Sequence, residues 1–364
     1  MARRLKYGLI GAGMMGHEHI RNIQLLENAE VAALYEPDAG MRDSAVALSG
    51  GVAVGSIAEL IERGDLDALV ISSPNFMHVD QIAEVARLGA LPMLVEKPLY
   101  TAPKDAARVA EIIQTYPAPI WVAMEYRYMP PIAQLIAEAE AVTGGIKMLT
   151  IREHRFPFLR KIGDWNRFNK YSGGTLVEKC CHFFDLMRFI LKAEPVRVMA
   201  SAGQMNNHLD EVYDGETSDI WDAGYVIVDF DTGARAMLEL CMFAEGSSFQ
   251  EEISAVGPKG KIECLVPGPG RMWPEHLGAA PVPQIIRSPR TPRGPERVEV
   301  PVDPALLKAG DHNGATFYQH AGFQQVVLGQ GAPEVSLEDG ARAVAMGLAA
   351  QRSARDGRAV ELSF

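Results

Sequence analysis

Apolar residues in the first third of the chain form short unbroken runs, separated by stretches in which they recur with helical spacing. Unbroken runs predict buried strands, and helical spacing predicts helices packed on them. The predicted strands are Lys6–Ile10, Glu30–Tyr35, Val52–Val54, Ala68–Ser72, Met93–Val95 and Ile120–Ala123. The predicted helices are Met14–Leu26, Asp38–Leu48, Ile57–Glu62, Phe76–Leu88 and Lys104–Gln114. This alternation predicts an α/β domain, residues 1–124, built on a doubly wound parallel sheet.

The pattern changes after residue 125, where apolar and polar residues alternate in strand-length runs. Turn sequences at 231–233 and 257–260 join successive runs, which predicts an open, mostly antiparallel sheet in a second α/β domain, residues 125–335. The proline-rich stretch Pro267–Pro304 is expected to be an irregular loop. The predicted strands are Ile146–His154, Val196–Ala202, Tyr225–Phe230, Ala234–Phe243, Glu252–Val256 and Lys261–Val266. The predicted helices are Met129–Ala141, Gly314–Leu328 and Leu337–Arg355.

Three glycines in the pattern G-x-G-x-x-G lie between the first predicted strand and the first helix. Gly11 permits the tight turn, Gly13 lets a pyrophosphate approach the backbone, and Gly16 lets the helix pack close to the strand. Twenty residues after Gly16, Glu36 ends the second strand, where a Rossmann fold places the acid that bonds the ribose. A dinucleotide site is therefore expected, lined also by Met14 and Met15; a purely structural turn is the alternative.

The cofactor is expected to be NAD rather than NADP, because Glu36 would repel a 2′-phosphate and Pro37 follows where NADP enzymes usually supply Arg or Ser.

Composition narrows the class of protein. Hydrophobic residues make up 48% of the chain, and no run of ~18 apolar residues suggests a membrane span. The net charge of −11 argues against general nucleic-acid binding. The first strand begins too early to leave room for a signal peptide, and the four cysteines show no C-x-x-C zinc spacing or disulfide framework. A cytoplasmic protein without a metal, a nucleic-acid partner or a membrane contact is expected.

Two motifs follow predicted strands of the first domain, at the sheet edge where such folds bind ligands. The expected cofactor contacts are Ser73, Pro74, Asn75 and His78 after the strand 68–72, and Glu96 and Lys97 after the strand 93–95. The bond between Lys97 and Pro98 is a candidate cis peptide. The alternatives are a proline turn with Asn75 capping a helix, and a surface ion pair followed by a proline stop.

A third motif, residues 173–185, begins with two glycines and is expected to form a helix that opens at Thr175. Glu178 and His182 are four residues apart and would share one helix face. Asp185 is three residues beyond His182 and would be placed to orient its ring. The alternatives are a capping box, in which Glu178 bonds the Thr175 amide, and a core role for His182.

Together these residues resemble the Gfo/Idh/MocA family, the glucose–fructose oxidoreductase and inositol dehydrogenase group. The resemblance covers nearly the full chain and rests on the order and spacing of five elements. They are the glycine loop 11–16, Ser73-Pro74-Asn75 with His78, Glu96-Lys97-Pro98, Gly173-Gly174 with His182 and Asp185, and the ending 353–358. The resemblance implies a Rossmann domain, an open-sheet domain, and a final helix, residues 336–364, that returns to the Rossmann domain. It also implies homodimers or homotetramers formed through the open sheet.

The family's catalytic group is a lysine in E-K-P, carried here by Lys97, with an Asp and a His spaced D-x-x-x-H. In this chain that spacing reads Glu178 and His182, so glutamate replaces the usual aspartate, and Cys180 stands where glycine is common. These departures suggest a subgroup with its own substrate.

The stretch 152–170 carries six Arg or Lys residues against two acids, and is therefore net +4. In the family this segment lies over the nicotinamide and the substrate. Aromatic faces suit a sugar ring, and arginine suits a carboxylate, phosphate or sulfonate. The expected substrate contacts are Arg155, Trp165, Asn166, Arg167, Lys179 and His182. The substrate is therefore expected to carry a negative charge or at least to be highly oxygenated; a solvated loop that contacts a neighbouring subunit is the alternative.

The expected function is an NAD-dependent oxidoreductase that moves hydride between nicotinamide and a hydroxyl-bearing carbon of a sugar or cyclic polyol. Either His182 or Lys97 would take the hydroxyl proton. The alternative is an NAD-dependent glycosidase that works by transient oxidation, elimination, hydration and re-reduction, on an anionic uronate or sulfo-sugar glycoside. A third possibility is a nucleotide-sensing regulator without chemistry.

Overall fold

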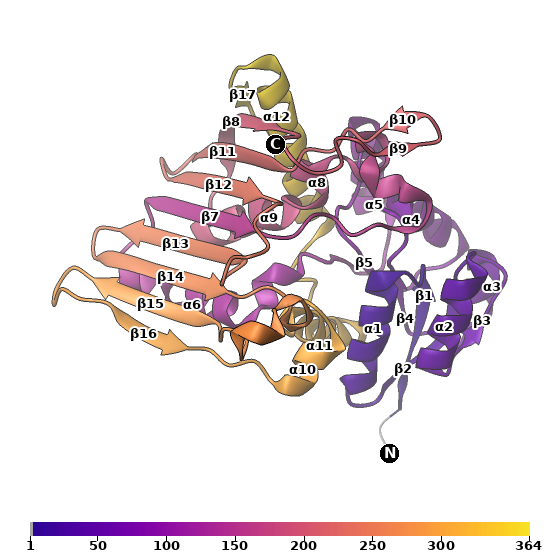
Figure 1. The fold of residues 1–364 in the computed structure, drawn as a ribbon. Helices are drawn as coiled ribbons and strands as arrows, with labels where there is room; N and C mark the ends of the chain where they lie inside the picture. Colours follow the sequence, from indigo (N-terminus) through magenta and orange to yellow (C-terminus); the bar gives the residue numbers. More distant parts are fainter. Residues whose placement is uncertain (1–2) are drawn as a thin grey trace.

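The computed structural model describes residues 3–364, which form two large β-sheets packed with helices and one small two-stranded sheet (Figure 1). The first sheet has six parallel strands in the order β3-β2-β1-β4-β5-β6, which confirms the predicted Rossmann sheet. Its strands are β1 Leu5–Ile10, β2 Ala29–Tyr35, β3 Val52–Ala53, β4 Ala68–Ile71, β5 Met93–Val95 and β6 Ile120–Val122. Its helices are α1 Met14–Leu25, α2 Ala39–Ser49, α3 Ile57–Glu62, α4 His78–Leu88 and α5 Ala106–Thr115.

Burial explains why the sequence pattern identified these strands. Every residue of β4 and β5 is buried, as expected for central strands of a sheet covered on both faces. The strand β1 pairs with β2 on one side and β4 on the other, so the chain order reverses beside β1. In such sheets the ligand crevice lies outside the carboxyl ends of the strands at this reversal.

The second sheet has nine strands in the order β16-β15-β14-β13-β7-β12-β11-β8-β17. Neighbours are antiparallel except for the parallel pair β7 and β12, so the prediction of a mostly antiparallel sheet is confirmed. Its strands are β7 Met148–His154, β8 Pro195–Gly203, β11 Ala223–Phe230, β12 Arg235–Cys241, β13 Glu251–Gly257, β14 Gly260–Val266, β15 Gln284–Pro289, β16 Glu296–Glu299 and β17 Val360–Glu361.

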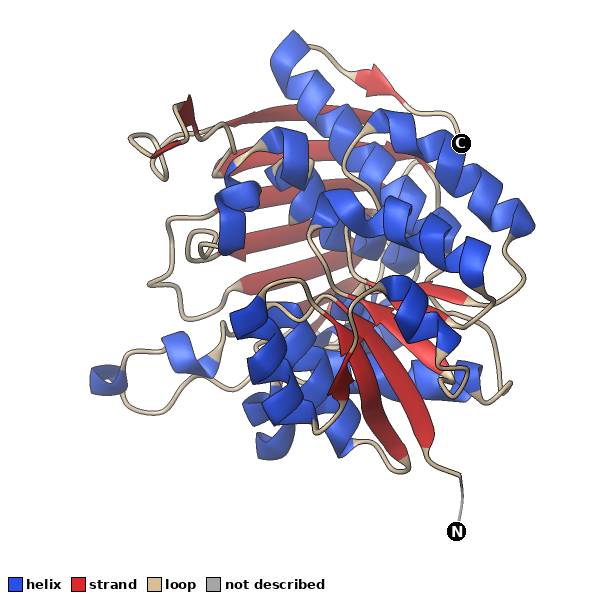
Figure 2. Cartoon of the chain, turned by 90° about the vertical axis from the view of Figure 1, so that its right-hand side faces the viewer, coloured by secondary structure: helices blue, strands red, loops and turns tan. Residues whose placement is uncertain are grey.

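Helices pack on one face of this sheet (Figure 2). They are α6 Pro130–Thr143, which contacts β14 and β15, α9 Cys181–Leu191, which contacts β7, and α12 Leu337–Asp356, which contacts β8. The strand β14 alternates between buried and partly exposed residues, as a half-covered sheet requires. The other face is open, and exposes large apolar side chains such as Met148, Met199, Tyr225 and Ile227.

The expectation of an irregular loop at Pro267–Pro304 is wrong. The segment contains β15 and β16 together with 3₁₀ turns at Gly270–Met272 and Glu275–Leu277. The strand β15 pairs with β14, and its residues Ile285 and Ile286 are buried. The proline content concealed an edge hairpin whose stability comes from tertiary packing rather than from a local pattern.

Two short strands, β9 Val212–Tyr213 and β10 Glu216–Thr217, form a separate hairpin that the sequence pattern did not predict.

The C-terminal segments connect the two sheets. The helices α10 Pro304–Ala309 and α11 Ala315–Val327 pack against α1. The helix α12 contacts α5 and β6 as well as β8, and a Cβ on its Gly340 would lie 2.9 Å from Val122 of β6. After α12 the chain adds β17 to the edge of the large sheet, beside β8. Among residues 3–364, no helix is both long and apolar enough to cross a membrane.

Candidate active site

The glycine loop is tightly packed at Gly11 and Gly16 but open at Gly13, where a phosphate could approach. Gly11 has a φ of +86°, and a Cβ there would lie 2.6 Å from the backbone nitrogen of Ser73. A Cβ on Gly16 would lie 2.8 Å from the carbonyl oxygen of Gly11, so α1 packs directly on the loop. A Cβ on Gly13 would meet only Met41, at 4.0 Å. The backbone at the start of α1 is therefore open to a ligand, with the free N–H groups that bind phosphates.

A groove of about 360 Å³ runs along this loop, at the carboxyl ends of β1, β2, β4 and β5. The predicted cofactor residues that line it are Gly11, Gly13, Met14, Met15, Glu36, Ser73, Pro74, Asn75, Glu96 and Lys97. Glu36 accepts hydrogen bonds from the backbone nitrogens of Ala12, at 2.7 Å, and Asp38, at 2.9 Å. Its carboxylate is thus held next to the glycine loop, where a ribose would lie. These features fit NAD.

His78 is placed outside this groove. Its ring is fully buried, with Nδ1 2.9 Å from the carbonyl oxygen of Pro98 and Nε2 3.1 Å from that of Ser73. Burial lowers the pKa of His78. The structure therefore gives this residue a role in holding two loops together rather than in touching the cofactor. Asn75 lines the groove and donates a hydrogen bond to Ser172, at 3.3 Å, rather than capping a helix.

A second cavity adjoins the groove, and the two share Met14, Met15, Lys97 and Lys161. Residues of both domains line it, including Lys97 from the end of β5 and Glu251 from the start of β13. The predicted catalytic and substrate residues that line this cavity are Lys97, Arg155, Glu178, Lys179 and His182.

Lys97 lies at the junction of the groove and the cavity. Its Nζ donates a hydrogen bond to the carbonyl oxygen of Glu178, at 3.1 Å, and the Lys97–Pro98 bond is cis. The preceding Glu96 is buried, where burial alone would raise its pKa, but a 3.0 Å contact with His19 lowers it. A lysine therefore stands where the nicotinamide end of a dinucleotide would meet a second ligand.

His182 is buried in the same cavity and stacks on Tyr126, with ring centroids 4.1 Å apart and an interplanar angle of 11°. Its Nδ1 has no hydrogen-bond partner within residues 3–364. Burial, and then the positive charges of Lys97 and Lys179, hold the pKa of His182 well below its usual value. The imidazole is therefore neutral and able to accept a proton.

The capping-box alternative for Glu178 and the expected role of Asp185 are both wrong. Glu178 does not form a capping box, because Gly174 occupies the N-cap position of α8 Thr175–Glu178 and the Thr175 hydroxyl donates to the carbonyl of Trp221. Asp185 does not orient His182, because its carboxylate forms two hydrogen bonds with Arg127. The chain also breaks between α8 and α9 instead of forming one helix.

Glu178 instead points toward the cavity. Its Oε1 is 3.8 Å from Nζ of Lys161, and its Oε2 is buried without a partner in the described chain. A buried carboxylate oxygen without a partner is rare in a structural role, which favours a ligand contact.

The cationic stretch 152–170 is largely neutralised by acids that lie outside it. Arg152 pairs with Glu252, Arg167 with Glu211 and Lys170 with Glu216. Within the stretch, Arg160 pairs with Asp164. The sum of +4 therefore overstated the charge presented to a ligand, because it counted only neighbours in sequence.

Only part of this stretch reaches the site. Arg155 lines the cavity, Trp165 lines the groove, and Lys161 lines both, with its Nζ 4.6 Å above the Trp165 ring. Asn166 and Arg167 line neither: Asn166 donates to the carbonyl of Leu159, and Arg167 is held by Glu211.

Several cavity residues were not predicted from the sequence. Tyr126 follows the end of β6, so its position at the functional edge of the sheet was a usable signal. Lys161 belonged to the cationic stretch but was not singled out. Glu251 and His312 gave no signal, because the second domain brings them to the cavity from distant strands and loops.

Glu18, Glu125 and His312 present ligand-type atoms within 4.8 Å of one another at the side of this cavity. They are engaged with each other, since His312 contacts Glu18 at 2.8 Å and Glu125 at 3.5 Å. Although burial opposes it, the two carboxylates raise the pKa of His312 to about 10. The cluster is therefore an ion-paired contact between α1 and the loop before α11.

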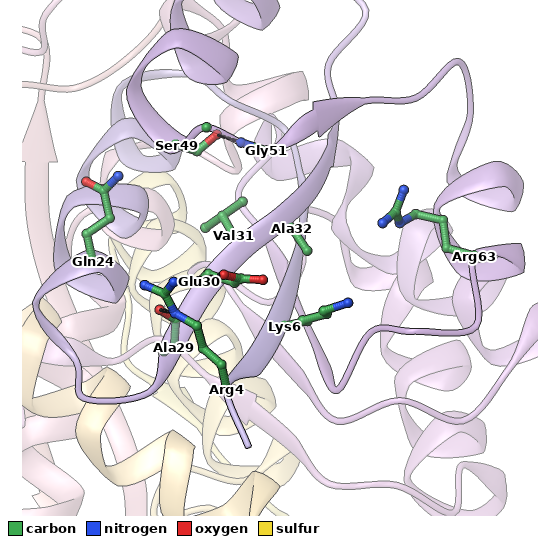
Figure 3. Close-up of a pocket in the computed structure, with 11 residues that line it drawn as sticks. Arg4, Lys6, Gln24, Ala29, Glu30, Val31, Ala32, Ser49, Gly51 and Arg63 are labelled. Carbon is green, nitrogen blue, oxygen red and sulfur yellow. Dashed lines mark hydrogen bonds and ion pairs between the residues drawn. The ribbon is translucent and has the colours of Figure 1, made fainter. Parts of the chain in front are cut away.

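Another hollow lies at the opposite edge of the Rossmann sheet (Figure 3). Its lining comes from the amino ends of β1 and β2, where Arg4 pairs with Glu30 at 3.1 Å. This is the edge away from the glycine loop, so the hollow plays no part in the site.

Comparison with known proteins agrees with this geometry. Residues 5–124 match the family model for an oxidoreductase family NAD-binding Rossmann fold, and residues 139–362 match the model for its C-terminal alpha/beta domain. The chain belongs to the Gfo/Idh/MocA oxidoreductase family. The resemblance inferred from the motifs is confirmed, as is NAD as the cofactor of the Rossmann domain.

Other Gfo/Idh/MocA-like proteins show how far the likeness extends. An inositol 2-dehydrogenase of Rhizobium meliloti is 27% identical over 262 residues, 71% of this chain and 74% of that protein. A putative myo-inositol dehydrogenase from Sinorhizobium meliloti has a similar fold, with a TM-score of 0.77 at 24% identity, covering 99% of this chain and 100% of that one. The WlbA dehydrogenase of Bordetella pertussis, solved with NADH and UDP-GlcNAcA, gives a TM-score of 0.76 at 21% identity and full coverage of both chains.

Proposed function

We propose that the protein is an NAD-dependent dehydrogenase that acts on a hydroxyl-bearing carbon of a sugar or cyclic polyol. The observation that carries this proposal is the meeting of Lys97, Glu178 and neutral His182 in a cavity that opens into the dinucleotide groove. The relatives named inositol 2-dehydrogenase support a polyol or sugar as the substrate class.

Bound NAD supplies the hydride acceptor. The protein has to bind the substrate hydroxyl and remove its proton as negative charge grows on the oxygen. His182 is the proposed base, because its imidazole is neutral and its Nδ1 is free of partners in the described residues. Lys97 is proposed to donate a hydrogen bond to the same oxygen, since its Nζ is held at the junction of groove and cavity. Glu178 is proposed to bind a substrate hydroxyl beside them.

The test is a substrate panel of neutral sugars, inositols, uronates, sulfo-sugars and their glycosides, assayed with NAD at neutral pH. NADH formation with a sugar or polyol supports the proposal. Release of an aglycone while NADH absorbance stays flat would instead support the redox-neutral glycosidase. Neither signal from any member of the panel would contradict both activities.

A further inference from the structure

Glu251 lines the cavity, and Glu153 lies opposite it on the neighbouring strand, so that two buried carboxylates are paired in register. Glu251 begins β13 and is the register partner of Glu153 on β7, and both side chains are at least 99% buried. The Nζ of Lys179 lies 2.9 Å from Oε1 of Glu153 and also bonds the hydroxyl of Tyr126. Tyr126 in turn stacks on His182, so the register partner of Glu251 is linked to the proposed base through Lys179 and Tyr126.

The hydrogen-bond pattern leaves one oxygen of Glu251 unused. Its Oε1 accepts a hydrogen bond from Nε2 of Gln250, at 2.6 Å. Its Oε2 is buried with no partner in residues 3–364, as are Oε2 of Glu178 and Nδ1 of His182. All three residues line the same cavity. Because buried polar atoms in native proteins are nearly always paired, three unpaired atoms around one cavity indicate a ligand with several hydrogen-bonding groups.

We propose that Glu251 is a specificity-determining residue that hydrogen-bonds a second hydroxyl group of the substrate, so that the preferred substrate is a neutral polyhydroxylated compound. This proposal rests on the proposed function and adds the group at the other end of the substrate. The reacting hydroxyl would lie at Lys97 and His182, and the second one at Glu251.

The charges around Glu251 favour a hydroxyl over an anion. Lys179 is the nearest cation, and it is already engaged by Glu153 and Tyr126. Arg155 donates to the carbonyl of Phe156 and lies 3.8 Å from Glu153. An anionic group at this end would therefore lie beside two carboxylates, and the cations Lys179 and Arg155 are both already paired with Glu153.

A hydroxyl also suits either protonation state of Glu251. Burial, and then the charge of Glu153, raise the pKa of Glu251 to about 7. A carboxylate Oε2 can only accept a hydrogen bond, whereas a protonated one can donate. A hydroxyl can serve as partner in both cases, because it carries both a proton and lone pairs.

The experiment compares the wild type with Glu251→Ala and Glu251→Gln, using D-glucose, D-glucuronate, D-glucosamine and myo-inositol as probes. The first three share a pyranose and differ in charge. Affinities are measured by calorimetry on the full chain loaded with NADH, and kcat and KM are measured for every probe that is oxidised. The matched control is Glu252→Gln, one residue further along β13, where the side chain pairs with Arg152.

We expect a neutral probe to bind most tightly. Glu251→Ala should raise both the Kd and the KM of that probe by about tenfold or more, with kcat changed by less than about threefold. Glu251→Gln should have a smaller effect, because an amide still forms hydrogen bonds, and Glu252→Gln should have none. If Glu251→Ala fails to fold, as judged by circular dichroism, the Gln variant carries the test.

Tightest binding of the uronate or of the amino sugar would overturn the proposal, as would unchanged affinity in both Glu251 variants. So would the absence of binding by every probe. If a probe binds in a Glu251-dependent way but is never oxidised, the proposed function fails while the assignment of Glu251 stands.

Discussion

Lys97 and His182 approach one cavity from different domains, and their surroundings assign them different tasks. Lys97 follows β5 of the Rossmann sheet and is held by a backbone carbonyl, whereas His182 lies on α9 and has a free Nδ1 within the described chain. A donor and an acceptor so placed can share one substrate oxygen during proton removal.

Lys97→Ala should remove most turnover while leaving the Kd of NAD within about threefold of wild type, because the ammonium acts mainly in the transition state. The measurements are kcat with the best substrate of the panel and calorimetric titration with NAD. Turnover within tenfold of wild type would assign Lys97 to a structural role.

The pH profile should reflect the lowered pKa of His182. Burial and nearby cations disfavour the charged ring, so the imidazole stays neutral at pH values below 6.5, the ordinary pKa of histidine. Activity should therefore be lost only as the pH falls further. At saturating NAD, the acidic limb of kcat/KM for the substrate should therefore have its midpoint below pH 6.5. A midpoint at or above 6.5 that persists in Glu251→Gln would contradict this, since that variant removes the neighbouring group with a pKa near 7.

The Glu178→Gln variant tests whether the Glu178 side chain contacts a ligand or caps a helix. Because Gly174 and not Thr175 is the N-cap, the substitution breaks no cap, and the melting temperature should stay unchanged. The kcat should fall or the KM should rise by roughly tenfold, because the amide would present an NH₂ donor in place of the free Oε2 acceptor or would rotate away from the ligand. Unchanged kinetics would remove Glu178 from the active site.

At the scale of elements, the end of β2 determines cofactor choice. Glu36 closes this strand and binds the backbone nitrogen of Ala12 in the glycine loop, so its carboxylate stands where a 2′-phosphate would have to lie. The wild type should therefore prefer NAD to NADP, and Glu36→Ala should narrow the difference between the two Kd values. Titration with both cofactors provides the measurement, and comparable wild-type affinities for the two would contradict the prediction.

Elements defined by their own residues could be predicted from the sequence, and those defined by distant partners could not. The all-apolar strand β4 and the glycine turn after β1 carry their signal locally. The strand β15 does not, because it pairs with β14 and its only strong features are Ile285 and Ile286 between prolines. In the site, Lys97 follows a recognisable strand, whereas Glu251 reaches the cavity through the register of β13 with β7. The charge of the stretch 152–170 was misjudged for the same reason, since its partners are remote in sequence.

At the scale of the whole molecule, the open face of the nine-stranded sheet exposes several large apolar side chains. Met199 of β8 and Ile227 of β11 are register neighbours and are 49% and 44% exposed, with Tyr225 at 56% beside them. Exposed apolar patches of this kind favour association. We therefore keep the prediction of a homodimer or homotetramer formed through this sheet.

The test introduces a charge into that face. Ile227→Asp should shift the molar mass measured by light scattering toward that of a single chain, because a carboxylate opposite Met199 cannot be buried without cost. Leu277→Asp, at a residue that is 55% exposed in the 3₁₀ turn Glu275–Leu277 outside the sheet, serves as the control and should leave the mass unchanged. A wild type that is already a single chain would contradict the prediction.

The contact between Gly340 and Val122 has a consequence for how such proteins can be recombined. Most residues that line the cofactor groove come from the first 124 positions, and most residues of the substrate cavity come later in the chain, which invites exchange of whole domains between relatives. The helix α12 is encoded with the second half but packs on β6 of the first. In a chimera joined near residue 124, the incoming helix must therefore carry a residue at position 340 that is small enough to pack against the side chain at position 122. Whether the residues at positions 340 and 122 pack together, rather than the sequence of the junction, should decide which hybrids fold.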